Sequence, residues 1–290
     1  QGEVFAGAAD SSYTHSYADL FPTASLEYTL TAGNTLSVLF ARRITRPDYQ
    51  DMNPFVYIFD DYLHERGNPE LKPALSNHLG VSFALKNRGQ ASLFFLWIKD
   101  PIVKSFHREG EDRMLVYPAN LSSRYVVGLR LQTAILHPLK WWLTGGSFSL
   151  NYGRYGWTEE NVREENTFLT PIAEWNNRFE LGKGWIVELQ ASYRGKGAEG
   201  QAVGKPFFVA SGGIRKSVFN RKGTVSLVVD DIFRSGLIRG TTTMPGRIYE
   251  SRERRQGRLL HLSFTYRFRS GEGVKSSSQK GKTEEEKRIR

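Results

Sequence analysis

Apolar and polar residues alternate with a period of two along most of the chain. Every second residue of 26–30 is apolar, and the same rhythm returns at 36–40 after Gly33 and Asn34. A period of two places neighbouring side chains on opposite faces of a β-strand. The pattern therefore predicts one hairpin over 26–40 and a second over 79–97, with its turn near 87–89.

The alternation continues to residue 268 and predicts about eleven strands of roughly ten residues, the length of a tilted transmembrane β-strand. The connections between them differ in length: short ones at 32–34, 87–90, 137–139, 182–184 and 220–223, and long polar ones at 44–77, 100–123, 154–166, 195–206 and 234–257. This contrast is typical of outer-membrane barrels. We expect an all-β antiparallel transmembrane barrel with short periplasmic turns and long extracellular loops; a soluble β-sandwich is the alternative.

Composition agrees with a membrane β-sheet. The 290 residues include 18 Phe, 13 Tyr, 6 Trp and 28 Gly, and barrels are rich in aromatic residues although their mean hydropathy resembles that of soluble proteins. No segment approaches the roughly 18 apolar residues of a membrane-spanning helix. The chain has no cysteine, and its histidines lack ligand spacing, so we expect no metal site and no cofactor.

The net charge of +10 is spread over turns, loops and the C-terminal segment. No compact basic motif interleaved with aromatic residues accompanies it, so we expect no nucleic-acid partner. The chain begins at Gln1 without an initiator methionine or a signal peptide. We therefore expect a fragment or a processed product.

The last predicted strand ends in an aromatic pair, Tyr266 and Phe268. This ending resembles the C-terminal signal of bacterial outer-membrane barrels, and the resemblance implies the barrel insertion machinery as a partner. Beyond it, residues 269–290 are rich in charge and hold only Val274 and Ile289 as aliphatic residues. Such a segment cannot bury enough apolar surface to fold, so we predict a disordered periplasmic tail.

Two segments of the first long loop carry a more specific pattern. The motif positions are Arg46, Pro47, Asn53, Pro54 and Phe55 in the first segment and Gly67, Asn68, Pro69, Leu71, Lys72 and Pro73 in the second. In order and spacing these segments resemble a pair found in TonB-dependent outer-membrane receptors, and residues 17–22 add a likeness to the outer-membrane β-barrel family of Bacteroidetes-type bacteria. The resemblance extends from about residue 17 to 268.

The resemblance implies a barrel of about 22 strands with a plugged lumen, set in the Gram-negative outer membrane among lipid and lipopolysaccharide. It further implies an N-terminal barrel half, a plug and, through the plug, the TonB–ExbB–ExbD complex. Residues 1–23 are then an extracellular lead-in, 24–268 the C-terminal part of the barrel and 269–290 the tail. About eleven strands alone leave two open edges, which lipid cannot satisfy. The alternative is a closed twelve-stranded barrel with an extra strand near residues 3–8.

Candidate ligand-binding residues lie in the long loops. Arginines of 234–257 suit an anionic ligand or lipopolysaccharide phosphates, although a solvated loop with local ion pairs is the alternative. Carboxylates and an imidazole in the first loop suit a ferric complex or acid–base chemistry, against a merely polar loop. These candidates are Arg239, Arg247, Arg252 and Arg254, and Asp60, Asp61 and His64.

The predicted function is TonB-dependent uptake of a siderophore, glycan or peptide, without covalent chemistry, so the chain is not expected to be an enzyme. One rival is a small closed barrel acting as a hydrolase, with His64 beside Asp60 or Asp61, or with Asp230 and Asp231. No recognisable serine motif accompanies either group. A second rival is a surface adhesin.

Overall fold

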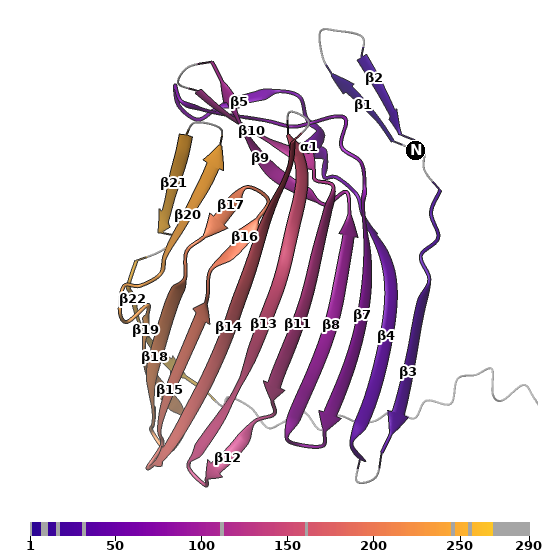
Figure 1. Ribbon diagram of the computed structural model, residues 1–290. Helices are drawn as coiled ribbons and strands as arrows, with labels where there is room; N and C mark the ends of the chain where they lie inside the picture. The colour runs from indigo at the N-terminus through magenta and orange to yellow at the C-terminus, as the bar shows by residue number, and fades with distance from the viewer. Residues whose placement is uncertain are drawn as a thin grey trace, which may run out of the picture.

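The computed structural model describes residues 2–6, 11–15, 18–30, 33–110, 113–159, 162–244, 247–254 and 257–268, and one large antiparallel sheet dominates them (Figure 1). Eleven strands form a continuous path, and the short β12 (Leu136–Leu139) pairs with β13 beside it. The predicted all-β fold of about eleven strands is confirmed. In spatial order the strands are β3 (Thr23–Thr29), β4 (Thr35–Thr45), β7 (Ala74–Leu85), β8 (Gly89–Lys99), β11 (Ser123–Thr133), β13 (Trp142–Glu159), β14 (Val162–Gly182), β15 (Trp185–Arg194), β18 (Phe207–Val218), β19 (Gly223–Asp230) and β22 (Leu259–Tyr266).

Tight turns join strands at one end of the sheet, the lower end in Figure 1. They fall where the sequence predicts short connections, for example at 86–88 and 219–222. Several turn residues have a left-handed backbone, among them Asn87 (φ 59°), Lys183 (φ 48°) and Asn220 (φ 50°). Asparagine adopts this region more readily than most residues, which explains its place in two of these turns.

The long connections at the opposite end fold into two small sheets that the sequence pattern did not reveal. One contains β5 (Val56–Ile58), β6 (Leu63–Arg66), β10 (Arg113–Asn120) and β9 (Ile102–Glu109). The other contains β16 (Gly197–Glu199), β17 (Ala202–Gly204), β20 (Leu237–Met244) and β21 (Arg247–Arg254). We call them the first and the second outer sheet. The described residues include one helix, α1 (Tyr49–Met52), and no helix among them is long and apolar enough to cross a membrane.

The predicted loop at 154–166 is wrong. Strands β13 and β14 continue through this stretch as a paired hairpin up to Glu159 and Val162. An ion pair between Arg154 and Glu165, with an N–O distance of 3.1 Å, joins the two strands there. The polar composition that suggested a loop therefore belongs to two strands that extend beyond the others.

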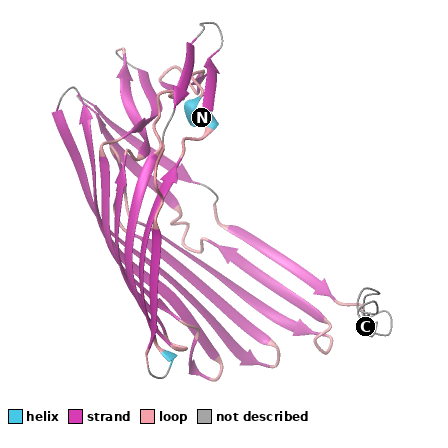
Figure 2. Cartoon of the chain, turned by 90° about the vertical axis from the view of Figure 1, so that its right-hand side faces the viewer, coloured by secondary structure: helices cyan, strands magenta, loops and turns pink. Residues whose placement is uncertain are grey.

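The N-terminal segment forms a separate hairpin of β1 (Gly2–Ala6) and β2 (Ser11–His15). Among the described residues β1 pairs with β2 and does not join the main sheet, so the alternative of a twelve-stranded barrel closed by a strand near residues 3–8 is wrong. The main sheet is open, with β3 and β22 at its two edges (Figure 2). The predicted tail, 269–290, lies outside the described residues.

The two faces of the main sheet differ in polarity. Directly paired residues share a face, so the register follows one face from strand to strand, as from Phe264 to its partner Val225. The exposed apolar side chains gather on that face, which we call the apolar face. Its members include Leu26, Val38, Leu79, Val81, Leu93, Phe95, Val127, Leu150, Leu189, Ile214, Val225, Leu262 and Phe264. An apolar surface of this extent requires lipid or protein to cover it.

Aromatic residues mark the tight-turn end of the apolar face. The rings of Trp142 and Phe179 lie 6.0 Å apart between centroids, and Lys216 Nζ lies 4.6 Å from the centre of the Trp185 ring. The indole nitrogen of Trp142 donates a hydrogen bond to Asn177 Oδ1 at 3.0 Å. Amphipathic rings favour the boundary between lipid and water, so these residues have the placement expected of an aromatic girdle.

A compact apolar cluster lies on the opposite face, near the long connections. Val126, Tyr155 and Phe168 of the main sheet are buried there against Val103 and Leu121 of the segment between β8 and β11. Each of the five is less than 10% exposed. This contact fixes the outer sheets to the main sheet at one end of the polar face.

Candidate functional site

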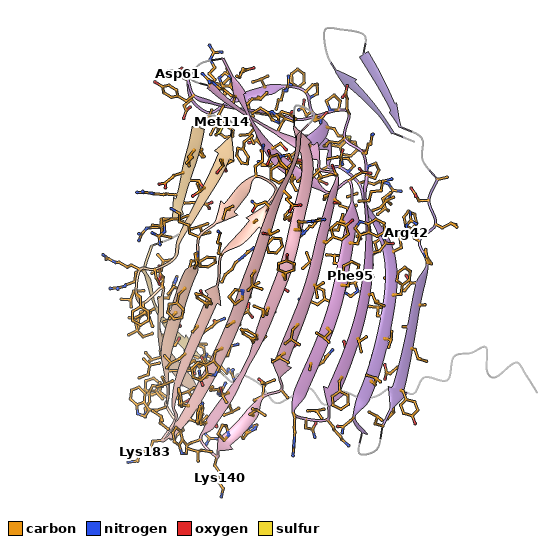
Figure 3. The ribbon with its side chains drawn as sticks, in the orientation of Figure 1. Arg42, Asp61, Phe95, Met114, Lys140 and Lys183 are labelled. Atoms are coloured by element: carbon orange, nitrogen blue, oxygen red, sulfur yellow. The ribbon has the colours of Figure 1, made fainter. Side chains whose placement is uncertain are left out.

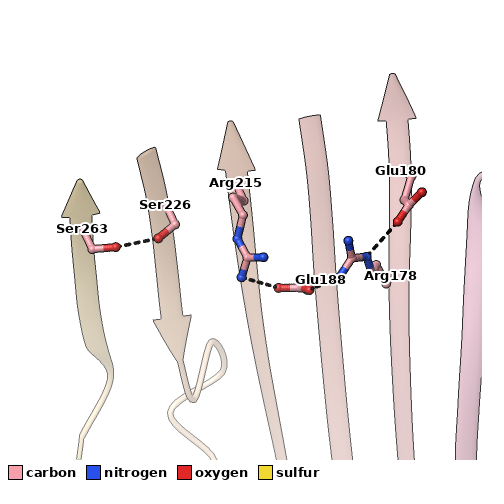
Figure 4. A network of polar contacts seen from close by, with 6 residues as sticks. All are labelled: Arg178, Glu180, Glu188, Arg215, Ser226 and Ser263. Atoms are coloured by element: carbon pink, nitrogen blue, oxygen red, sulfur yellow. Dashed lines mark hydrogen bonds and ion pairs between the residues drawn. The ribbon is translucent and has the colours of Figure 1, made fainter. Parts of the chain in front are cut away.

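Charged side chains on the polar face contact one another across three strands. Arg178 of β14 lies 3.1 Å from Glu180 and 3.6 Å from Glu188, measured between nitrogen and oxygen, and Arg215 of β18 lies 3.5 Å from the second oxygen of Glu188 (Figure 4). Glu188 therefore joins two guanidinium groups. Because all of these side chains are exposed, each pair contributes at most about 1 kcal/mol, and their main effect is a charged surface of fixed geometry.

The row of polar contacts continues to the edge of the sheet. The hydroxyl oxygens of Ser226 and Ser263 lie 2.7 Å apart, which links β19 to β22 (Figure 4). On the same two strands, His261 Nε2 lies 3.4 Å from Asp230 Oδ2. Side-chain contacts on the polar face therefore form two groups, one that joins β14, β15 and β18 and one that joins β19 and β22.

A cavity of about 630 Å³ opens beside this row. Strands β13, β14 and β15 supply most of its polar lining, with carboxylates, amides, hydroxyls and a guanidinium. Among these residues are Ser147, Glu174, Asn176, Arg178, Glu188 and Gln190. A surface with both donors and acceptors suits water or a polar solute more than an apolar one.

The two motif segments of the first loop contact each other directly. The amide of Gly67 donates to the carbonyl of Asn53 at 2.8 Å, and the amide of Asn68 donates to the carbonyl of Asp51 at 2.6 Å. A Cβ on Gly67 would lie 2.5 Å from Asn53 N and 2.7 Å from Asp51 O. Position 67 therefore has no room for a side chain, which gives a physical reason for glycine there.

The second motif segment is also fixed to β10. Asn120 accepts from the amide of Lys72 and donates to its carbonyl, both at 2.8 Å, while Asn68 Nδ2 donates to the carbonyl of Pro118 at 3.2 Å. Leu71, between them, is 1% exposed. A cavity of about 370 Å³ remains between the segments, bounded by Pro54, Arg66, Gly67, Asn68, Pro69, Glu70 and Tyr117.

The structure does not gather the candidates of the first loop into one group. Asp60 Oδ1 accepts from the amides of Tyr62 and Leu63 at 2.8 and 2.7 Å, and so closes the turn between β5 and β6. His64 is turned toward Glu109, 3.4 Å away, and Asp61 lies at the far end of the loop (Figure 3). In the described part of the chain, no cluster of three or more His, Asp or Glu residues could hold a metal ion.

The arginine candidates lie on the second outer sheet. Arg239 of β20 is the direct cross-strand partner of Arg252 of β21, and Arg254 follows two residues later on β21. Arg252 lies 3.4 Å from Glu250 on its own strand. Arg247 is the first residue of β21, and its side chain lies outside the described part. The structure thus brings Arg239 and Arg252 together, and the sequence could not reveal this because it depends on register.

The carboxylate of Asp231, a candidate base for a hydrolase, accepts hydrogen bonds from residues of its own turn. It is buried and accepts hydrogen bonds from Ser235 N at 2.8 Å, Ser235 Oγ at 3.3 Å and Gly236 N at 3.0 Å. Burial acts to raise the pKa of its carboxyl, but these donors prevail and lower that pKa below its ordinary value. A carboxylate stabilised in this way is a weak base, which suits a turn better than catalysis.

The aromatic ending of the last strand lies at the tight-turn end of the sheet. The rings of Tyr266 and Phe268 lie 4.7 Å apart, and Phe219 of the neighbouring turn lies 5.9 Å from Tyr266. Phe268 is 85% exposed. The predicted insertion signal is thus accessible at the end of an edge strand.

A family model described as the outer membrane protein beta-barrel family matches residues 4–266, nearly the whole chain. The chain belongs to this family. It is therefore a protein of the Gram-negative outer membrane, as predicted. The apolar face of this outer membrane β-barrel protein is the face toward lipid, and its polar face is the face toward the lumen.

Solved structures of outer-membrane receptors have the same fold as this family member. The copper transporter OprC matches with a TM-score of 0.60 at 16% identity over 90% of this chain and 41% of its own. The ferric enterobactin receptor PfeA of Pseudomonas aeruginosa, as a mutant bound to enterobactin, matches with a TM-score of 0.51 at 17% identity over 85% and 40%. The chain spans about two fifths of the length of these receptors. No curated protein matches it.

The contacts of Arg178, Glu188 and Arg215 lie on the face toward the lumen, and the sequence analysis did not identify them as a group. Glu188 and Arg215 were not singled out, because isolated charged residues in an alternating strand look like ordinary solvent contacts. The signal was present in the alternation itself, since Glu174, Asn176, Arg178 and Glu180 occupy every second position. Barrels of this family are typically transport proteins rather than enzymes.

Proposed function

We propose that the chain is the C-terminal part of the barrel of a TonB-dependent transporter that imports a nutrient across the outer membrane. The observation that carries the proposal is the open sheet. Its lipid-facing side is apolar, its other side is polar, and 90% of the chain superposes on 41% of a copper transporter. In lipid each unsatisfied backbone group at an edge costs several kcal/mol, so β3 and β22 need strand partners.

These partners are strands of an N-terminal barrel half in our proposal. A plug fills the lumen against the polar face and passes energy from TonB–ExbB–ExbD, while the barrel insertion machinery reads Tyr266 and Phe268. Residues 1–23 are the outer lead-in to the first strand of this part.

The outer sheets, with Asp60, Asp61 and His64 on one and the arginines on the other, contact the nutrient or lipopolysaccharide. PfeA is named for ferric enterobactin and OprC for copper. The nutrient that we propose for this chain is a siderophore, a glycan or a peptide.

Energy dependence tests the proposal. Cells that produce the complete protein should deplete at least one nutrient from a defined mixture, and an in-frame deletion of the 24–268 coding region should abolish the depletion. A protonophore should abolish it as well, because TonB draws on the inner-membrane proton gradient. Depletion that continues unchanged with the protonophore would contradict TonB-dependent uptake and favour a passive pore.

A further inference from the structure

Three cationic residues lie side by side on the second outer sheet. The amide of Lys205 donates to the carbonyl of Arg239 at 2.8 Å, which continues the β17–β20 pairing beyond Gly204, and Arg239 is paired with Arg252 across β20 and β21. All three side chains are exposed. The row brings together residues 34 and 13 positions apart in the sequence (205, 239 and 252), and only the register of three strands aligns them.

The three positive charges of the row exceed the single negative charge of Glu250, the acidic residue that contacts it. Glu250 lies 3.4 Å from Lys205 Nζ and 3.4 Å from Arg252. The charge of Lys205 and then that of Arg252 lower the pKa of the Glu250 carboxyl, which keeps it ionised. The side chain of Arg239 has no hydrogen bond or ion pair with any residue that the structure describes, and Arg239 is the direct cross-strand partner of Arg252. Like charges opposite each other destabilise a sheet, and a bound anion removes that repulsion.

The contacts of the sheet place the row on the lumenal side. Glu250 lies two positions from Arg252 on β21, so both side chains are on one face of the sheet. Cross-strand partners share a face, and the register links Glu250 to Thr241, Val203 and Ala198 in turn. Ala198 packs against the apolar cluster that contains Tyr155 on the polar face of the main sheet. A solute entering the lumen would therefore meet the cationic row, whereas lipid headgroups lie around the other side of the barrel.

We propose that Lys205, Arg239 and Arg252 form a binding site for a soluble anion that bears phosphate or carboxylate groups. The assignment of this anion as imported cargo rests on the proposed transport function, whereas the binding itself does not. Guanidinium groups bind both oxygens of a phosphate or carboxylate at once, which gives geometric selection in addition to charge. Lipopolysaccharide phosphates have the same chemistry, so the test separates the two sources.

Calorimetric titration of the complete purified protein in detergent with tripolyphosphate tests the site. The double variant R239Q/R252Q should weaken binding by about tenfold or more, because charged hydrogen bonds are lost. E250Q should tighten binding by up to about fivefold, because it frees two cations from an internal pair. The matched control, K140Q/K183Q, removes two positive charges at the tight-turn end (Figure 3) and should leave binding unchanged.

Equal affinity of the wild type, R239Q/R252Q and E250Q would overturn the proposal. The same titration in nanodiscs that contain lipid A identifies the source of the anion. Binding of tripolyphosphate that persists there supports a soluble ligand, and binding that disappears would show that a lipid headgroup occupies the row, which also overturns the proposal. Neither measurement needs TonB or energy, so loss of energy-dependent uptake and loss of anion binding are separate outcomes.

Discussion

The variant Gly67→Ala should lower the free energy of local unfolding of the first long loop by about 3 kcal/mol. This value is the upper end of the range for overpacking. The new Cβ would lie 2.5 Å from Asn53 N, an atom of the backbone that cannot rotate away as a side chain would. The hydrogen bonds of Gly67 and Asn68 to the other motif segment would be lost. In hydrogen exchange, protection of these two amides should fall on the order of a hundredfold.

Gly156→Ala is the matched control for this variant. A Cβ there meets only Ser123 Oγ, at 3.6 Å, an ordinary contact. Its exchange pattern should remain that of the wild type. Unchanged protection of amides 67 and 68 in Gly67→Ala would contradict the structural role that the contacts assign to the motif pair.

A positive charge on the lipid side of the sheet should destabilise the barrel strongly. Leu189 lies midway along β15 on the apolar face, and Gln190, its neighbour, lines the lumenal cavity. Arginine near the bilayer midplane of a barrel costs about 2–4 kcal/mol on the lipid side. Leu189→Arg should therefore lower the free energy of unfolding in urea by that amount, measured on the complete protein in lipid vesicles.

Gln190→Arg places the same side chain one residue further along the same strand, where water and carboxylates surround it. It should change the free energy of unfolding by less than about 1 kcal/mol. Equal losses for the two arginine variants would show that the faces are assigned wrongly, and a larger loss for Gln190→Arg would reverse them.

The main sheet was predictable because one of its faces meets lipid. That contact imposes a period of two on every strand, as at Val225, Leu227 and Val229, and the turns carry asparagine and glycine. The two motif segments were found by resemblance, yet their physical role became visible only when Gly67 and Asn53 were seen in contact.

The outer sheets could not be predicted, because no local pattern defines them. β5 has three residues, and its partner β6 pairs in turn with β10, about fifty residues later in the chain. Three residues are too few to show the period of two that identifies a strand. The cationic row could not be predicted for the same reason. Arg239 and Arg252 were candidates from the sequence, but the position of Lys205 beside them depends on the register of β17 and β20.

The most direct test of an open sheet within a larger barrel is disulfide cross-linking in outer membranes, since the chain has no native cysteine. Y28C/F264C places cysteines on the two edge strands, β3 and β22, and S226C/S263C places them where two hydroxyls lie 2.7 Å apart. In the complete protein, oxidation should join the second pair within one monomer and leave the first pair unjoined. Efficient cross-linking of Y28C/F264C within a monomer would show that β3 meets β22, and would contradict the claim that other strands complete this barrel.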